Sequence, residues 1–300
     1  MRIIASANQK GGCGKTTTAI NLSYFLAGKG EKVLLIDFDP QAHATMGLNI
    51  DPSDLKISMY DVVRPWHNGS TGIKDILIPI GENFDLAPSS ASLSAVEQEL
   101  SGLTGRESKL LRAIEALQKT YNYIIIDCPP SIGHLCFNAL RACGEVIIPI
   151  DLSLFSLRGV SKLQEMITAL KEKLDHDTNA RALITMYDNR TRYSRQVFDE
   201  VKEVFQENMF ETVIRYNIRL RETGDCGLPI GEYDKHAMGY KDYEDLAEEV
   251  IRSQVTEMNQ ASIGEHPPHI HESLQQHVTE HVGDELAYSA YIMKENTQTD

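Results

Sequence analysis

The residues best suited to chemistry form a short glycine-rich segment near the N-terminus. It reads Gln9-Lys10-Gly11-Gly12-Cys13-Gly14-Lys15-Thr16-Thr17 and stands between an apolar run and a helix-like stretch. Glycines allow backbone N–H groups to turn toward a polyphosphate, and the N-terminus of the following helix adds a favourable dipole. In such a loop the lysine reaches the β- and γ-phosphates, and the next threonine hydroxyl is a ligand for Mg²⁺. The segment therefore predicts a phosphate loop in which Lys15 and Thr16 have these roles.

Carboxylates end two later apolar runs of the sequence. Asp37-Phe38-Asp39-Pro40-Gln41 ends the run that begins at Lys32, and Asp127 ends the run Tyr123–Asp127. Ligands of open parallel sheets bind beyond the carboxyl ends of the strands, where these side chains would lie. A single aspartate at a strand end often only caps the strand, but three motifs in this order favour a nucleotide site. At such a site the carboxylate of Asp39 can orient an attacking water.

Apolar runs alternate with helix-like stretches along the first 255 residues, and no internal repeat is present. This alternation predicts right-handed βαβ units and an α/β fold, with a doubly wound, mainly parallel sheet flanked by helices. The expected strands cover residues 2–7, 32–37, 84–86, 123–127, 146–150 and 182–186. The expected helices cover residues 15–27, 92–101, 108–119, 156–173, 195–207 and 241–254.

The composition is ordinary for a globular protein of 300 residues, with 42% apolar and 24% charged residues. No apolar run approaches the ~20 residues that span a bilayer, and no signal peptide is evident. The five cysteines form no CxxC pair, as expected for reduced thiols in a cytoplasmic protein. These features exclude a membrane span, a secreted disulfide scaffold, a collagen and a wholly disordered chain.

The net charge of −14 is unevenly distributed. Residues 256–300 contain eight acidic residues and one basic residue, Lys294, and so carry −7 of it. Five of the ten histidines also lie there. We therefore expect a phosphate-loop domain over residues 1–255 and an acidic, histidine-containing, flexible tail over residues 256–300. Because the chain is acidic, any DNA contact must come from a local basic patch.

The loop departs from an ordinary phosphate loop at one end. Gln9 replaces the first glycine of the GxxxxGK pattern, and Lys10 precedes a glycine pair. This spacing, KGGxxK[ST], is similar to the deviant Walker A motif of the ParA/MinD ATPases. DFDPQ at 37–41 and YIIIDCPP at 123–130 resemble that family's catalytic-aspartate and Walker B segments. The resemblance covers residues 1–253, and four later segments look like those of chromosomal, Soj-type ParA proteins: 87–97, 147–159, 183–197 and 213–234.

The resemblance implies an ATPase that uses ATP and Mg²⁺ and forms a homodimer when ATP binds. In such a dimer Lys10 reaches the nucleotide of the partner subunit, Lys15 contacts the phosphates, and Asp39 is the catalytic aspartate. Mg²⁺ is implied at Thr16, Asp39 and Asp127. The other implied nucleotide contacts are Gly11, Gly12, Cys13, Gly14, Thr17 and Asn217.

Seven arginines lie between residues 181 and 221 of this acidic chain. Arg190 and Arg219 match positions where ParA relatives contact DNA. A guanidinium donates bidentately to phosphate, and without interleaved aromatic side chains such contacts ignore base sequence. The cluster can also be a solvated face balanced by carboxylates. The resemblance favours non-specific DNA binding, a ParB-like activating partner, and a nucleoid-associated cytoplasmic location without membrane contact.

Two departures from the family and one alternative function bear on this interpretation. The family reads IPRN where this chain has Ile214-Arg215-Tyr216-Asn217, which alters the expected adenine pocket. The family's basic run after YDP is reduced to Lys235 and His236. The alternative is a ligase of the cobyrinate or dethiobiotin synthetase kind, which uses a similar loop to phosphorylate a small carboxylate. The DPQ segment favours a partition or positioning ATPase.

Overall fold

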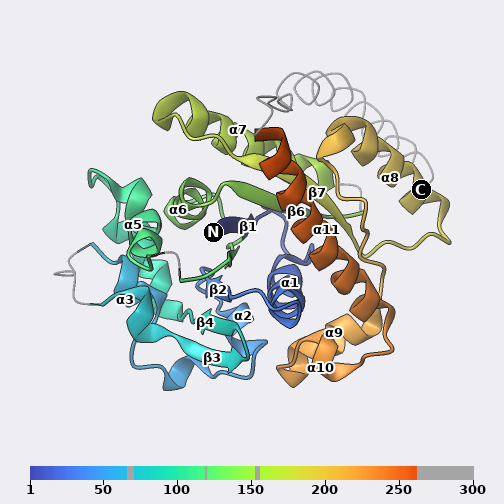
Figure 1. Ribbon diagram of the computed structural model, residues 1–300. Coiled ribbons are helices and arrows are strands. Elements are labelled where there is room, and N and C mark those ends of the chain that lie inside the picture. Colours follow the sequence, from blue (N-terminus) through green and yellow to red (C-terminus); the bar gives the residue numbers. More distant parts are fainter. Residues whose placement is uncertain (66–70, 119, 153–155, 262–300) are drawn as a thin grey trace, which may run out of the picture.

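The computed structural model describes residues 1–65, 71–118, 120–152 and 156–261 (Figure 1). Within them a seven-stranded sheet has the order β3-β4-β2-β5-β1-β6-β7. Every neighbouring pair is parallel except β3 with β4. The predicted α/β class and the doubly wound, mainly parallel sheet are confirmed. The strands are β1 (Arg2–Ser6), β2 (Val33–Asp37), β3 (Ile78–Gly81), β4 (Phe84–Ala87), β5 (Tyr123–Asp127), β6 (Glu145–Asp151) and β7 (Asn179–Thr185).

Helices connect most of the strands and return the chain across the sheet. In chain order they are α1 (Lys15–Gly28), α2 (His43–Met46), α3 (Met59–Val63), α4 (Val96–Glu99), α5 (Lys109–Glu115), α6 (His134–Ala142), α7 (Ser156–Leu174), α8 (Arg192–Phe205), α9 (Ile218–Cys226), α10 (Ile230–Tyr233) and α11 (Met238–Ala261). No helix of the described residues is long and apolar enough to cross a membrane.

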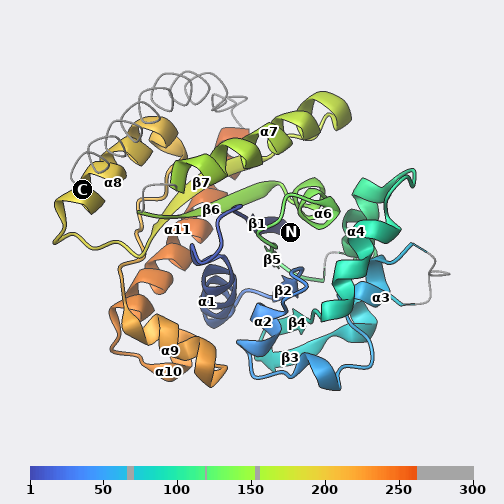
Figure 2. The ribbon, with the colours of Figure 1, turned by 180° about the vertical axis from the view of Figure 1, so that it is seen from behind.

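Side chains along each central strand alternate between two apolar cores, one on each face of the sheet. In β2, Leu34 and Ile36 face one core, whereas Val33 and Leu35 face the other. The first core is covered mainly by α5, α6, α7 and α8, and the second by α1, α10 and α11, so helices lie on both sides of the sheet (Figure 2). Burial on both faces explains why these strands are continuous apolar runs in the sequence.

Each expected strand is present, and the main differences lie in short or edge elements. The antiparallel strand β3 was not predicted. It lies at the edge of the sheet, where its proline, Pro79, is tolerated. Helices α2, α3, α6, α9 and α10 were not predicted either. Helix α9 has no apolar periodicity to indicate it, and Thr223 is its one buried residue.

Several predicted boundaries shift for local reasons. The helix expected over 195–207 begins at Arg192, because the Thr191 hydroxyl accepts the N–H of Ser194 (3.1 Å) and caps it. It ends at Phe205, because Gln206 adopts a positive φ of 48°. The strand expected to end at residue 186 stops at Thr185, where the next residue has a φ of 54°.

The helices expected over 92–101 and 108–119 are shorter than predicted. The first is a 3₁₀ segment, Ala91–Ala95, followed by the single turn α4. The second, α5, ends at Glu115, and residue 119 lies outside the described residues. Helix α11 continues past residue 255 to Ala261, and residues 262–300 are outside the described part. The division into a domain over 1–255 and a tail over 256–300 therefore stays a prediction.

Candidate active site

The strand order brings three predicted motifs to one edge of the sheet. Strand β5 pairs with both β1 and β2, and Ser6 and Asp37 are each in register with Asp127. The phosphate loop follows the end of β1, and the DPQ segment follows the end of β2. All of them lie at the carboxyl edge of the sheet, where doubly wound folds bind ligands.

The loop between β1 and α1 has the backbone that its glycines suggest. Gly12 and Gly14 have φ angles of 75° and 94°, a region that is costly for residues with a Cβ atom. Gly11 and Gly12 are exposed, and helix α1 begins directly after Gly14. The loop thus offers backbone N–H groups and a helix N-terminus to an anion.

Contacts from β6 and the end of β7 hold this loop in place. The Asn8 amide donates to the carbonyl of Pro149 (2.7 Å) and accepts the N–H of Lys10 (3.1 Å). The Thr185 hydroxyl donates to the carbonyl of Cys13 (2.8 Å). Backbone and small polar groups outside the two lysine side chains therefore brace the loop.

The two lysines of the loop have different surroundings. Lys15 is buried, and its Nζ donates to the carbonyl of Lys10 (2.9 Å). Lys10 extends its own Nζ to Asp151 at the end of β6, where the ion pair is 2.6 Å long. Asp151 was not among the predicted site residues. Its position after the run 146–150 parallels that of Asp127 and is the signal that could have indicated it.

A buried group of carboxylates faces the loop. Asp37 is fully buried and accepts hydrogen bonds from the N–H (2.8 Å) and hydroxyl (2.7 Å) of Thr45. Burial raises the pKa of Asp37 to about 6, although these hydrogen bonds limit the rise. Asp39 is nearly buried, and its carboxylate accepts the N–H of Gln41 (2.9 Å). Asp37 thus shapes the DPQ turn that presents Asp39.

The surroundings of Asp127 show whether this site suits a metal ion. Both of its carboxylate oxygens are buried without a hydrogen-bond partner in the described structure. Burial and the neighbouring charge of Asp37 raise its pKa well above the usual range, whereas Thr16 and Lys15 lower it. An unpartnered buried carboxylate is costly unless a cation joins it. The donor set around Asp127, with a threonine hydroxyl and oxygen ligands, fits Mg²⁺.

The site suits a cation that takes most of its ligands from water and phosphate and few from the protein. Among the described residues no group of three or more His, Cys, Asp and Glu side chains is placed to hold a metal ion. Mg²⁺ at phosphate loops keeps several waters and phosphate oxygens and takes few protein ligands. Thr16 and Thr17 are half-buried at the start of α1, and Asp39 lies beside Asp37.

Asn217 lies on a separate segment at the same edge of the sheet. Its side-chain oxygen accepts the N–H of Arg219 (2.9 Å) and caps helix α9. The preceding residues form a parallel bridge between Tyr187 and Arg215, just beyond the end of β7. Because Thr185 at that end also holds the phosphate loop, the segment with Asn217 lies on the loop's side of the sheet.

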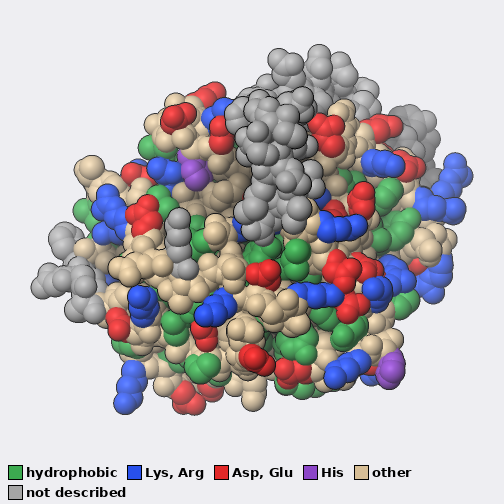
Figure 3. Space-filling view, in the orientation of Figure 1, with side chains coloured by type: hydrophobic (Ala, Val, Ile, Leu, Met, Phe, Trp, Pro, Cys, Tyr) green, Lys and Arg blue, Asp and Glu red, His purple; other side chains and the backbone are tan. Residues whose placement is uncertain are grey.

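The two arginines expected to contact DNA are both exposed and both paired. The Arg190 side chain is 81% exposed and binds Asp188 through two hydrogen bonds of 2.7 and 2.8 Å. These bonds lower the pKa of Asp188 to about 2. Arg219 is 50% exposed and pairs with Glu222 at 2.9 Å. Basic side chains lie among acidic ones on the face shown in Figure 3.

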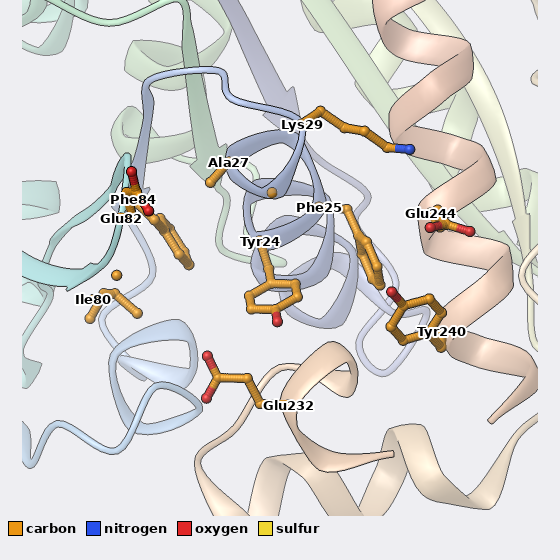
Figure 4. A pocket seen from close by; sticks show the side chains of 12 residues that line it. Tyr24, Phe25, Ala27, Lys29, Ile80, Glu82, Phe84, Glu232, Tyr240 and Glu244 are labelled. Atoms are coloured by element: carbon orange, nitrogen blue, oxygen red, sulfur yellow. The ribbon is translucent and has the colours of Figure 1, made fainter. Parts of the chain in front are cut away.

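One pocket lies apart from these residues, at the C-terminal end of α1 (Figure 4). It has a volume of about 320 Å³ and is lined by aromatic and acidic side chains, among them Tyr24, Phe25, Tyr240 and Glu232. No residue of the phosphate loop lines it. The candidate nucleotide site is therefore the edge that carries the loop and the strand-end carboxylates.

Known proteins are similar to this chain in sequence and in fold. The model of a family described as AAA domain matches residues 1–180. The sporulation initiation inhibitor protein Soj of Bacillus subtilis is 42% identical over 250 residues, which cover 83% of this chain and 98% of Soj. The chromosome partitioning protein ParA of Caulobacter vibrioides is 40% identical over 256 residues, covering 84% of this chain and 94% of that protein.

A related solved structure contains ligands. Cobyrinic acid a,c-diamide synthase from Mycobacterium smegmatis, with a bound ATP analogue and magnesium, is 31% identical with a TM-score of 0.70. The match covers 84% of this chain and 95% of that one. The synthase shares the fold of this chain, and Soj and ParA have the higher sequence identity. This chain therefore belongs to the ParA/Soj family of P-loop ATPases.

Proposed function

We propose that this protein is an ATP-dependent, dimerising ATPase of the ParA type, which binds DNA non-specifically and acts in chromosome or plasmid partition or in positioning another cargo. Family membership and the geometry of the loop edge support this proposal. ATP is the proposed substrate and Mg²⁺ the proposed cofactor, as in the related synthase structure. The proposed location is the cytoplasm, at the nucleoid, and the proposed activating partner is ParB-like.

Each predicted residue receives a role in the proposed site. Lys15 contacts the terminal phosphates, while backbone N–H groups of Gly11–Gly14 and the side chain of Thr17 surround them. Asp39 orients the attacking water. Thr16 and Asp127 hold Mg²⁺, with Asp39 close by, and the ion supplies neutralising charge to the phosphates. Asn217 binds the base.

The contacts of Lys10 are the main support for the proposed dimer. Its side chain is 26% exposed and pairs with Asp151, while the loop is braced by other groups. The ion pair can therefore break without unfolding the loop. A second cation so close to Lys15 is not required by a single phosphate chain, but it suits a second nucleotide facing it across a symmetric interface.

Lys10→Ala is expected to retain ATP binding and lose the ATP-dependent dimer. The reason is that Asn8 and Thr185 brace the backbone of the loop, whereas the proposed contact to the partner's phosphates depends on the Lys10 side chain. Light scattering with ATP measures the dimer, and Lys74→Ala, at an exposed lysine far along the chain, is the control. A normal dimer from Lys10→Ala would refute the cross-interface role.

Arg190 and Arg219 are the proposed DNA contacts, although each is held by a carboxylate. Both pairs are exposed, and exposed ion pairs contribute little to stability, so phosphate can displace the carboxylates. A dimer presents each arginine twice and offers four contacts. Counterion release then gives a slope of about −3.6 in log K against log salt.

Arg219→Glu is expected to lower DNA affinity by roughly tenfold or more and to halve the salt slope, because it removes two of the four contacts. The ATP-dependent dimer should be unaffected. Binding of duplex DNA at several salt concentrations, with ATP and with ADP, measures both effects. Lys241→Glu makes the same charge change at an exposed, ion-paired position of α11 and is the control. Equal losses from both variants would mean that net charge, not this surface, governs binding.

A ligase acting on a small carboxylate is the second candidate, favoured by the solved synthase relative. The two functions differ in what accelerates ATP turnover. Phosphate release should rise with duplex DNA and a ParB-like protein if the first proposal holds, and with cobyrinic acid if the second does. Stimulation by the small acid alone would replace the partition proposal.

A further inference from the structure

Arg215 joins the segment that follows β7 to helix α11. In the bridge at this position the N–H of Tyr187 donates to the carbonyl of Ile214 (3.0 Å), and the N–H of Tyr216 donates to the carbonyl of Tyr187 (3.0 Å). The N–H of Arg215 lies outside the bridge. Here that N–H donates instead to Asp242 on α11 (2.9 Å).

Asp242 makes a full set of contacts to Arg215. Its second oxygen accepts hydrogen bonds from the guanidinium Nε (2.9 Å) and Nη2 (2.5 Å). Asp242 is only 4% exposed, whereas the Arg215 side chain is 42% exposed. The carboxylate raises the pKa of Arg215. A buried carboxylate that loses such a partner is strongly destabilised, so this contact is firmly held in the folded chain.

The next residue of α11 contacts the other half of the candidate site. The hydroxyl of Tyr243 shares a hydrogen bond with the hydroxyl of Thr18 (3.2 Å), and both side chains are buried. Thr18 lies in the first turn of α1, the helix that begins at Lys15. Two adjacent residues, Asp242 and Tyr243, therefore join the segment before α9 to the helix of the phosphate loop.

We propose that Asp242 is a positioning residue for the nucleotide: through Arg215 it holds the segment 214–217 at a fixed place relative to the phosphate loop, and so places Asn217 against the base. This inference rests on the proposed ATP site. The Asn217 oxygen is engaged by the N–H of Arg219, which leaves the NH₂ group as the donor for an acceptor on the base. Asp242 itself does not touch the nucleotide.

The test compares two ligands that share the phosphates and differ in the base. Full-length protein is titrated with ATP and with inorganic tripolyphosphate, both in Mg²⁺. In Asp242→Asn the Kd for ATP should rise roughly tenfold, about the effect of one charge-assisted hydrogen bond. The Kd for tripolyphosphate should not change, because the loop and Tyr243 are intact. Arg215→Gln removes the guanidinium of a half-exposed side chain but keeps the backbone N–H of residue 215. The Kd for ATP should therefore rise by a smaller factor.

The same helix offers a matched control in Glu249. This carboxylate is also nearly buried and accepts the N–H groups of Glu211 (3.0 Å) and Thr212 (2.9 Å) and a guanidinium N–H of Arg181 (2.8 Å). Glu249→Gln should lower the melting temperature as Asp242→Asn does, yet leave both Kd values at the parent level.

A double variant tests rescue. Arg215→Pro with Asp242→Val replaces the ion pair by a residue of fixed φ and removes the buried charge, so ATP should bind with parental affinity. The inference is overturned if Asp242→Asn binds ATP like the parent, or if it loses ATP and tripolyphosphate in equal proportion. A parent that binds neither ligand would instead overturn the proposed nucleotide site itself.

Discussion

Lys15→Ala should bind ATP at least roughly a hundredfold more weakly than the parent, because it removes a buried cation whose charge-assisted contacts to phosphate are worth several kcal/mol. The rest of the cradle would remain, since Asn8 and Thr185 hold the loop without the lysine. Titration calorimetry with ATP and Mg²⁺ measures the loss.

The same lysine donates to the carbonyl of Lys10, so the fold of the variant must be checked. We expect its melting temperature without nucleotide to be close to that of the parent. Lys74→Ala, which changes the same charge at an exposed site, should bind ATP normally. If Lys15→Ala binds ATP as tightly as this control, the nucleotide does not lie in the loop.

Asp39→Ala should bind ATP within about threefold of the parent and lower the turnover rate by roughly a hundredfold or more, the usual loss when a group that positions the nucleophile is removed. Asp39 is nearly buried beside the loop, and no basic side chain of the described structure pairs with it. Its carboxylate is thus free to accept a hydrogen bond from water.

Phosphate release at saturating ATP measures this effect, and a separate titration gives the affinity. Glu82→Ala, at an exposed carboxylate in the turn between β3 and β4, is the control for lost negative charge. Parental turnover by Asp39→Ala would show that another group orients the water. The neighbouring Asp37 is a poor substitute, because one of its oxygens already binds Thr45 and the other accepts the N–H of Asp39.

The sequence predicted the sheet and the loop because their signals are local. Strands such as Tyr123–Asp127 are buried on both faces and stand out as continuous apolar runs. Gly12 and Gly14 are next to the residues that they position, and both adopt the backbone that only glycine adopts easily. Helix α9 lacked such a signal, since almost none of its side chains are buried.

The contacts that the sequence did not predict join residues far apart in the chain. Lys10 pairs with Asp151 across 141 positions, and Arg215 pairs with Asp242 on another element. By contrast, Arg190 and Arg219 pair with carboxylates two and three positions away, as the alternative of a balanced, solvated face allowed. Residue type shows what a side chain can do, whereas the strand order decides which partner it meets.

The molar mass of the full-length chain with and without ATP tests the central claim most directly. Asp39→Ala is the best form to use, because slow turnover keeps ATP in place. Light scattering should give 33.6 kDa without nucleotide and with ADP, and twice that mass with ATP and Mg²⁺. Lys10→Ala in the same background should stay monomeric. A mass that is the same in all three nucleotide conditions would contradict an ATP-driven dimer and the account built on it.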